Sequence, residues 1–366
     1  MNYRLLTLCT LIPFGAPALK AQSPYISRVY EYKPAPGQFV NELPEWEEGD
    51  DAEAMRQKAE DCIARHEQQL ISLGGWGGYV TFGFDHTVRN RRGQYDFKIL
   101  GNAFYASSTP DDFTRIGGNS EPGIVQVSRD TNGNQLPDDP WYELQGSSHA
   151  DPHTLHGYRC TYHRPHEGHV PTPSPSDRAI LDTTYIPWTD NAGQTGYIMR
   201  NTYHRQDYYP RWIAADTISF EGTRLPDNGV DVSGTGTSYL LYSCEWGYAD
   251  DHPNEPKFSA DQVDSDSPLL HPSEFKIDWA VDSSGRSVWL PGIDFVRVYT
   301  GVNQYNGWIG EVSTEILDAW DLHMLDASGQ PVSEPDDEPE SPYDIDGDGT
   351  LTISDITSLI RIYLDR

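Results

Sequence analysis

Short apolar segments that alternate with turn residues run from Tyr79 to Thr300, and this pattern constrains the fold more than any other feature. The segments are rich in β-branched and aromatic residues, and Gly, Pro, Asn and Asp separate them. This alternation is typical of antiparallel sheets joined by turns, and it predicts a mainly β sandwich or barrel. The predicted strands are YVTFGF (79–84), YDFKIL (95–100), GIVQVS (123–128), WYEL (141–144), YRCTYH (158–163), DTISFEG (216–222), SYLLYSCEWGY (238–248), FKIDWAV (275–281) and IDFVRVYT (293–300).

The composition predicts a folded and strongly acidic protein. The 366 residues include 10 Trp, 22 Tyr and 11 Phe, which can build a hydrophobic core. There are 56 Asp and Glu but only 26 Lys and Arg, so the net charge is −30. A general nucleic-acid binder needs Lys and Arg to displace counterions from phosphates, and the acidity excludes that class. The same charge argues against docking on an anionic membrane surface.

Residues 1–21 have the pattern of a secretory signal peptide. Arg4 supplies the positive charge, an interrupted apolar stretch follows, and cleavage after Ala21 is expected. We therefore expect an exported protein, secreted or at the cell surface, without a transmembrane segment. Export permits a disulfide between two of the three later cysteines, and buried free thiols are the alternative. These cysteines are Cys62, Cys160 and Cys244.

The remainder of the chain divides where the composition changes. Residues 47–70 predict an N-terminal helix, because apolar positions lie near one face and acids crowd the start. Residues 326–343 are rich in Pro, Ser and acids without periodic apolar positions, which predicts an extended linker. We expect a β domain at 22–325, followed by the linker and a separate module at 344–366.

The last module contains the pattern of a calcium-binding loop. Asp lies at loop positions 1, 3 and 5, Gly349 at position 6 permits a sharp turn, and an acid lies at position 12. Apolar residues after the loop recur with helical spacing, so a single amphipathic helix is predicted to follow. The expected Ca²⁺ ligands are Asp344, Asp346, Asp348, Thr350, Thr352 and Asp355.

The segment DIDGDGTLTISDITSLIRIYL (344–364) resembles a dockerin repeat. Dockerins carry two such repeats, which together recognise a cohesin, whereas one repeat is present here. The resemblance implies attachment or assembly through this module, with a cohesin-like protein as the possible partner. Because dockerins accompany secreted polysaccharide-degrading machinery, it also implies carbohydrate biology.

A second loop, between the segments 123–128 and 141–144, has a weaker calcium pattern. Its oxygen-bearing side chains share the 1-3-5 spacing, but Trp141 stands where the closing acid belongs. The alternative is an ordinary hairpin turn, since Asn-Gly is a strong turn signal. The Ca²⁺ ligands here would be Asp130, Asn132, Asn134, Leu136, Asp138 and Asp139.

Six segments of the large domain together resemble a further family. They are ISLGGWGGYVTFGFDH (71–86), YDFKILGNAF (95–104), EPGIVQVSRDTNGNQLPDDPWYELQGS (121–147), EWGYADDHPN (245–254), FKIDWAVD (275–282) and IDFVRVYTGVNQYNGWIGEVSTEI (293–316). They resemble a family of secreted or cell-surface β-sandwich proteins of gut-type Gram-negative bacteria, similar to galactose-binding-like jelly rolls. The resemblance implies a large, antiparallel, jelly-roll-like β-sandwich that binds a ligand. Some relatives are associated with surface capture of nutrients, including corrinoids such as vitamin B12.

Three sets of side chains are candidates for binding. Aromatic rings for the CH faces of a sugar are expected at Tyr208, Tyr209, Trp212 and Trp246, with core packing as the alternative. Clustered histidines suit Zn²⁺, Cu²⁺ or a corrinoid cobalt, with ordinary loop residues as the alternative; they are His149, His153, His156, His163, His166 and His169. A ligand or ion site, or hydrogen bonding to buried loops, is expected of Asp96, Asn102 and Glu121.

Catalytic motifs give no clear assignment. The sequence has no GxSxG elbow, P-loop or dinucleotide fingerprint. A paired-carboxylate glycosidase stays open, because the distance between two acids is invisible in a sequence. The leading hypothesis is a secreted, non-catalytic, carbohydrate-binding protein with a calcium-binding dockerin-like module. The alternatives are a polysaccharide-degrading enzyme of the glycoside hydrolase type, a surface protein that captures a corrinoid, and a structural spacer.

Overall fold

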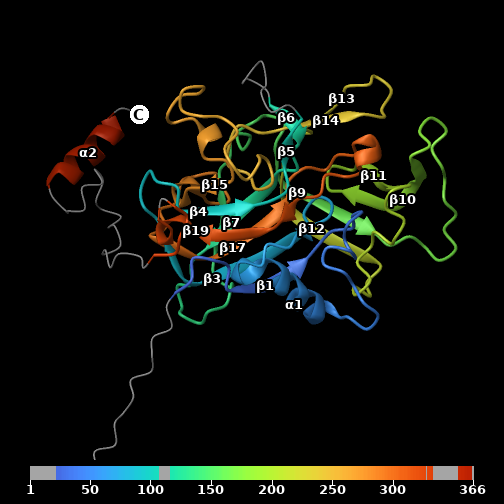
Figure 1. The fold of residues 1–366 in the computed structure, drawn as a ribbon, viewed down its shortest axis with the longest axis horizontal. Helices are drawn as coiled ribbons and strands as arrows, with labels where there is room; N and C mark the ends of the chain where they lie inside the picture. The colour runs from blue at the N-terminus through green and yellow to red at the C-terminus, as the bar shows by residue number, and fades with distance from the viewer. Residues whose placement is uncertain (1–21, 107–115, 327, 333–352, 365–366) are drawn as a thin grey trace, which may run out of the picture.

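Figure 1 shows the computed structural model, which describes residues 22–106, 116–326, 328–332 and 353–364. The chain is mainly β, and neighbouring strands in its sheets pair antiparallel, as the turn-separated pattern predicted. The sheets are small, and their arrangement is closer to the blades of a four-bladed propeller than to a clear jelly-roll sandwich. The prediction of a mainly β, antiparallel fold is therefore confirmed at this coarser level.

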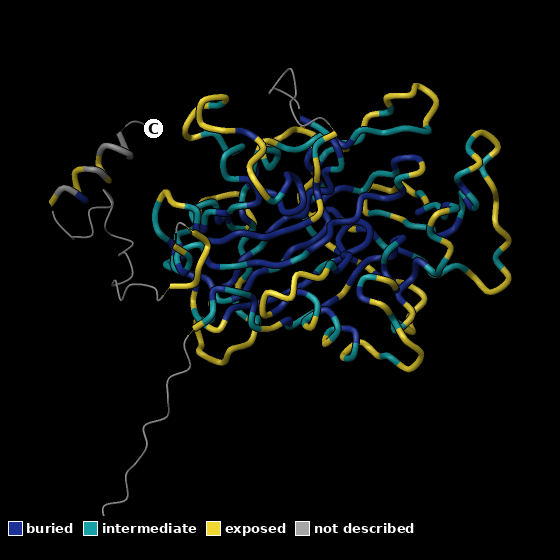
Figure 2. The backbone as a smooth tube through the Cα atoms, viewed as in Figure 1, coloured by how far each residue is buried: buried dark blue, intermediate teal, exposed yellow. Residues whose placement is uncertain are grey.

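A six-stranded sheet forms the centre of the molecule. Its strands, in spatial order, are β1 (Arg28–Lys33), β3 (Tyr79–Arg89), β17 (Gly292–Thr300), β7 (Gly123–Ser128), β8 (Trp141–Leu144) and β16 (Ala280–Val281). Val298 of β17 pairs with Val80 of β3 on one side and with Val125 of β7 on the other. All three are fully buried. Such cross-strand apolar pairs stabilise a sheet, and the buried residues gather in the middle of the molecule (Figure 2).

The other strands form smaller sheets around this centre. One contains β11 (Thr195–Asn201), β10 (Ile180–Asp190), β9 (Leu155–His163) and β12 (Thr217–Arg224). Another contains β13 (Gly229–Asp231), β14 (Tyr239–Tyr242), β6 (Gly117–Asn119) and β5 (Phe104–Tyr105). The remaining sheets contain β15 (Glu274–Phe275), β4 (Phe97–Leu100) and β19 (Asp318–Asp321), and then β18 (Glu315–Ile316) and β2 (Ile71–Ser72). The ends of β5, β6, β14 and β18 supply the site described below.

Helical segments are short. The N-terminal helix α1 (Ala52–Ile63) starts where Asp51 accepts a hydrogen bond from the backbone N–H of Ala54 at 2.9 Å. It is shorter than the predicted 47–70, because the residues that follow adopt the left-handed backbone region, which a helix cannot contain. Single 3₁₀ turns lie at η1 (Ala64–His66), η2 (Pro268–Leu270), η3 (Ile277–Trp279), η4 (Gly307–Ile309) and η5 (Leu322–Met324).

The C-terminal helix α2 (Ile353–Leu364) follows the predicted calcium loop, as expected. Asp355 in its first turn is only 3% exposed, whereas four apolar side chains on the helix are exposed. They are Ile353, Ile356, Leu359 and Ile360. The helix therefore presents an apolar surface to solvent in this structure.

Several expectations fall on residues outside the described ranges. These are the signal peptide at 1–21, most of the linker at 326–343 and the loop residues Asp344, Asp346, Asp348, Thr350 and Thr352. Within the part of the chain that the structure describes, no helix has the length and apolarity needed to cross a membrane. Cys62, Cys160 and Cys244 are free thiols, and burial raises the pKa of Cys160 to about 12.

Candidate ligand-binding site

A pocket of about 410 Å³ opens where the β5–β6–β14 sheet meets the loops around η4 and the N-terminal segment. We call it the aromatic pocket. It is lined by Gln38, Phe39, Asn102, Phe104, Ala106, Gly118, Asn119, Glu121, Tyr203, His204, Tyr239, Leu240, Trp308, Ile309 and Glu315. Aromatic rings, side-chain amides and carboxyl groups thus face one space, a combination that suits an organic ligand with both apolar and polar groups.

Three of the lining aromatic side chains are unusually exposed. Phe104 is 57% exposed, Tyr203 is 65% exposed and Trp308 is 49% exposed. The rings of Tyr203 and Trp308 meet edge to face, with their centroids 6.0 Å apart. Large rings normally bury most of their surface, so rings held in mutual contact at a pocket mouth are available for a ligand.

Three buried carboxyl groups lie close to one another, and two of them line the same pocket. This acid group consists of Glu121, Asp250 and Glu315, whose side-chain oxygens lie within 4.8 Å of one another. Glu121 precedes β7, and Glu315 begins β18. Asp250 lies far from both in the sequence, in a loop that an isolated bridge between Gly123 and Ala249 ties to β7.

Backbone donors hold the acid group in place. Asp250 Oδ1 accepts from the N–H groups of Asn102 at 2.6 Å and Ala103 at 2.9 Å, and its Oδ2 accepts from Glu315 N–H at 2.9 Å. Gly101 permits this approach, because a Cβ there would lie 2.2 Å from Asp250 Oδ1. Glu121 Oε1 accepts from Ser313 N–H at 2.9 Å.

Burial makes the acid group retain protons. It raises the pKa of Glu121 to about 7. It also raises the pKa values of Asp250 and Glu315 well above their ordinary range, and the charges of the neighbouring acids add to the effect. Like charges at this separation are costly in a dry interior, so protons are shared within the group near neutral pH. A protonated carboxyl is a hydrogen-bond donor, and a carboxylate is an acceptor.

A fourth buried acid lies next to the pocket. Glu311 Oε1 accepts from the N–H of Gln38 at 2.6 Å, and its Oε2 has no hydrogen-bond partner among the described residues. Burial raises the pKa of Glu311 to about 7. Glu121, which lines the pocket, and Glu311, which bonds to the lining residue Gln38, therefore both have pKa values near neutrality rather than near 4.

The four aromatic residues proposed from sequence lie elsewhere. Tyr208 and Tyr209 are buried in the cluster that packs the β9–β12 sheet, so neither ring presents a face to a ligand. Trp212 stacks on Tyr32 with ring centroids 6.1 Å apart, and Trp246 packs on Trp279 at 4.7 Å. None of the four lines the aromatic pocket. In this structure the four side chains pack against other aromatic and apolar residues, as the alternative interpretation of the sequence has it.

Of the three polar residues proposed from sequence, two lie in the pocket. Asn102 and Glu121 line it, but Asp96 does not. The carboxylate of Asp96 accepts from the N–H groups of Arg91 at 2.9 Å and Ile277 at 2.7 Å, and it pairs with His323 at 2.9 Å. Asp96 thus stabilises buried loops, the alternative that the sequence left open.

The loop from Asp130 to Asp139 satisfies its oxygen atoms internally. Asp130 accepts from the N–H groups of Gly133 at 2.6 Å and Gln135 at 2.7 Å. Asn134 donates to Asp138 at 2.9 Å and accepts from Leu136 N–H at 2.8 Å, and Asn132 accepts from Asn134 N–H at 2.9 Å. Thr131 donates to Asp139. These contacts describe a turn closed by its own side chains.

The six clustered histidines do not form one site, because their side chains have different partners. His149 and His156 lie together with Glu143, with ligand atoms within 4.8 Å of one another. His153 pairs with Asp151, and His169 pairs with Asp182. The side chains of His163 and His166 bond to Thr189 and to the backbone of Glu167. Of these histidines, His149 and His156 are the two whose ligand atoms come together with those of an acid, Glu143.

Comparison of the chain with models of known protein families and with curated proteins found no match. The functional argument therefore starts from the geometry of the sites themselves.

Proposed function

We propose that this protein is exported and binds carbohydrate, without turning it over, in the aromatic pocket. One observation carries the proposal: exposed rings at the pocket mouth lie beside buried carboxyl groups that line its wall. Sugar rings present CH faces that pack on aromatic side chains, while their hydroxyl groups both donate and accept hydrogen bonds. Trp308 and Tyr203 supply the first kind of surface, and Glu121 with Glu315 supplies the second.

Side-chain amides extend the polar part of the pocket. Gln38, Asn102 and Asn119 line it, and Asn119 donates to Glu121 Oε2 at 2.9 Å. Gln38 Nε2 donates to the carbonyl of Ile309 at 2.6 Å, which fixes the wall next to Trp308. Groups whose orientation is fixed before binding lose less entropy when a ligand arrives, which favours specificity for the arrangement of hydroxyls.

The C-terminal segment adds a calcium-dependent attachment function to this proposal. Asp344, Asp346, Asp348, Thr350, Thr352 and Asp355 are the proposed Ca²⁺ ligands. The burial of Asp355 and the exposed apolar surface of α2 support a module that turns an acid inward and offers apolar residues to a partner protein. Export through the signal peptide and a galactose-binding-like, jelly-roll-like β-sandwich fold are part of the same proposal, and both rest on the sequence patterns alone.

A specific observation favours hydrolysis as a second candidate function. A glycosidase needs two carboxyl groups in a cleft, one of them protonated near neutral pH. Glu121 and Glu315 line the pocket, and the pKa of Glu121 is about 7. Binding is nevertheless the better-supported function, because Glu315 is almost fully buried and both acids are held by neighbouring donors.

A glycan array followed by calorimetry on the retained glycans tests the proposal. We expect saturable binding without release of reducing ends, and a loss of affinity of about tenfold in Trp308→Ala, because a ring-stacking surface is removed. Tyr197→Ala is the matched control, since Tyr197 is 44% exposed on β11 but does not line the pocket. Product release that stops in Glu121→Gln would establish the hydrolase instead. Tight binding of cobalamin without any glycan would establish corrinoid capture.

A further inference from the structure

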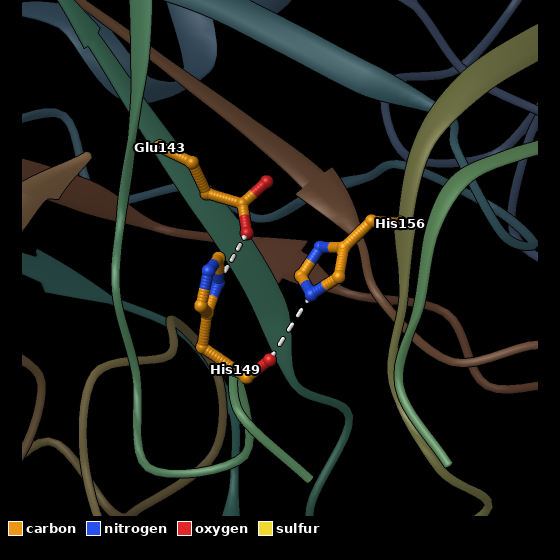
Figure 3. A group of neighbouring side chains, drawn as sticks. All are labelled: Glu143, His149 and His156. Carbon is orange, nitrogen blue, oxygen red and sulfur yellow. Dashed lines mark hydrogen bonds and ion pairs between the residues drawn. The ribbon is translucent and has the colours of Figure 1, made fainter. Parts of the chain in front are cut away.

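A second group of side chains, away from the aromatic pocket, combines nitrogen and oxygen ligands (Figure 3). This histidine group consists of Glu143 on β8, His149 in the loop that follows, and His156 on β9. His149 Nδ1 lies 3.1 Å from Glu143 Oε1, and the rings of His149 and His156 lie 4.6 Å apart between centroids. The three side chains converge from two strands of different sheets and from the loop that connects them.

The hydrogen bonds of His156 determine its tautomer. Its Nε2 lies 3.2 Å from the backbone carbonyl oxygen of His149. A carbonyl oxygen only accepts, so Nε2 carries the proton and Nδ1 of the neutral ring has a free lone pair. Nδ1 lies 3.3 Å from Thr223 Oγ1, whose single proton is donated to Glu143 Oε2 at 2.9 Å. The lone pair of Nδ1 therefore meets no proton there, which is the state of an imidazole that binds a cation.

The carboxylate of Glu143 is held in position from behind. Its Oε2 accepts from Thr223 at 2.9 Å and from the hydroxyl of Tyr299 at 3.2 Å. The hydroxyl oxygen of Tyr299 in turn accepts from Thr223 N–H at 2.9 Å. Such outer contacts orient metal ligands and leave Oε1 facing the imidazoles.

The group faces an open space. It lines a cavity of about 450 Å³ that also includes Trp141, Asp282 and Glu221. His149 and Glu143 are mostly buried, while His156 is exposed at the cavity rim. A cation that entered here would have three protein ligands on one side and solvent on the other, the arrangement that leaves a coordination position for water or a bound molecule.

We propose that Glu143, His149 and His156 form a binding site for a transition-metal ion of the Zn²⁺ class. Tetrahedral zinc ligands lie roughly 3.4 Å apart, and the 3.1 Å between His149 Nδ1 and Glu143 Oε1 matches that separation. The metal replaces the proton that joins these two atoms, and Nδ1 of His156 supplies the third ligand. Two imidazoles select Zn²⁺, Cu²⁺ or Ni²⁺ over Ca²⁺, so this site differs in chemistry from the predicted calcium loop.

Titration of the full chain with Co²⁺ and Zn²⁺ in excess Ca²⁺ tests the site, because Ca²⁺ occupies sites that consist only of oxygen ligands. We expect one Co²⁺ to give the intense visible bands of a low-coordinate site with nitrogen ligands. One equivalent of Zn²⁺ should remove these bands. Calorimetry of Zn²⁺ uptake then gives the affinity of each variant.

Three variants identify the ligands. His156→Ala removes an exposed ligand without disturbing the core, and we expect it to weaken Zn²⁺ binding at least tenfold and to abolish the Co²⁺ bands. Glu143→Gln should weaken it to a similar degree, and Thr223→Val should weaken it several-fold through the lost orientation of Glu143. His153→Ala is the control, because His153 belongs to the same segment but is 82% exposed and outside the group. Equal Zn²⁺ affinity in His156→Ala and His153→Ala overturns the proposal, as does the absence of Co²⁺ bands in the unmodified protein.

Discussion

The acid group and the histidine group contain three potential ligands each within the same separation, yet they differ in burial and in their donors. Glu121, Asp250 and Glu315 are all buried. Backbone N–H groups donate to Asp250 and Glu121, and the hydroxyl of Ser313 donates to Glu315. In the histidine group, Glu143 accepts from the hydroxyls of Thr223 and Tyr299, His156 is bonded to the backbone carbonyl of His149, and the His156 imidazole reaches solvent. A closed group of acids neutralises itself with protons, whereas an open group with imidazoles can accept a metal ion.

The comparison teaches that proximity of ligands does not decide their chemistry. In the acid group the energetic cost of burying charge is met by raised pKa values and by backbone N–H groups that donate to the carboxyl oxygens. In the histidine group the three ligand atoms lie within 4.8 Å of one another, and a cation would displace the proton between His149 and Glu143 without removing the backbone contact of His156.

The largest expected effect concerns the structural role of the acid group. Asp250→Ala leaves the N–H groups of Asn102, Ala103 and Glu315 without an acceptor in a buried place. We expect it to lower the free energy of unfolding by about 3–5 kcal/mol, because each orphaned buried donor is costly. Urea denaturation measures this loss. Asp216→Ala is the control, since the Asp216 side chain is 93% exposed and its loss should cost less than about 0.5 kcal/mol. Equal losses of stability in the two variants would show that the acid group has no structural role of this kind.

The pH dependence of stability should report the buried acids. The pKa of Glu311 is about 7 in the folded protein because of burial, against an ordinary value of 4.5. Between these values the folded state binds more protons than the unfolded state, so stability falls as the pH rises from about 4.5 to about 7. The contribution of this group amounts to roughly 3 kcal/mol.

Thermal unfolding of Glu311→Gln checks that expectation. The amide cannot ionise, so the variant should lose less stability than the unmodified protein between pH 5 and about 8. The difference between the two curves isolates Glu311 from other titrating groups. A difference that is constant with pH would show that Glu311 ionises normally in the folded protein.

Zinc should stabilise the folded protein through the histidine group and not through the acid group. At a free Zn²⁺ concentration one hundred times the dissociation constant, binding to the folded state alone adds about 2.7 kcal/mol to the free energy of unfolding. We expect this increase in the unmodified protein and in Glu121→Gln, and its loss in His156→Ala. Denaturation with and without Zn²⁺ at a fixed pH measures it. Stabilisation that disappears in Glu121→Gln but persists in His156→Ala would place the metal in the acid group and reverse the comparison.

The smallest expected effect concerns Ca²⁺ and the C-terminal helix. Chelation should reduce the helical circular dichroism signal of α2, because the carboxylates of the predicted loop repel one another without the ion. The unfolding midpoint of the β body should not move, since the loop lies beyond the predicted linker. Asp346→Ala should behave in calcium as the unmodified protein does in chelator. A helical signal that survives chelation unchanged would contradict the assignment of these ligands.

The local sequence pattern predicted those strands whose buried positions are occupied by apolar residues. The segments GIVQVS and WYEL coincide with β7 and β8, and IDFVRVYT coincides with β17 to within one residue. In contrast, β10 and β11 were not predicted, because polar and small residues interrupt their apolar positions. Their pairing is decided by neighbouring strands rather than by their own sequence. For the same reason the strand pattern predicted a mainly β fold but not how the sheets are arranged, which is closer to a propeller than to a clear jelly-roll sandwich.

The sites show the same division. Glu121 and Asn102 stood out as polar residues beside apolar strands, and the close spacing of His149 and His156 was visible in the sequence. The sequence did not show that Trp308 is exposed, or that Asp250, Glu315 and Glu143 belong to these sites. Rings and acids at distant positions carry no local signal of a shared site.

The sequence by itself determined an acidic, mainly β chain with a helix near each end, because charge, alternation and capping act between near neighbours. The tertiary structure alone decided which acids retain protons, which histidines meet a carboxylate and which rings stay exposed. These properties depend on burial and on distances between residues far apart in the chain. Such distances are fixed only when the sheets pack together.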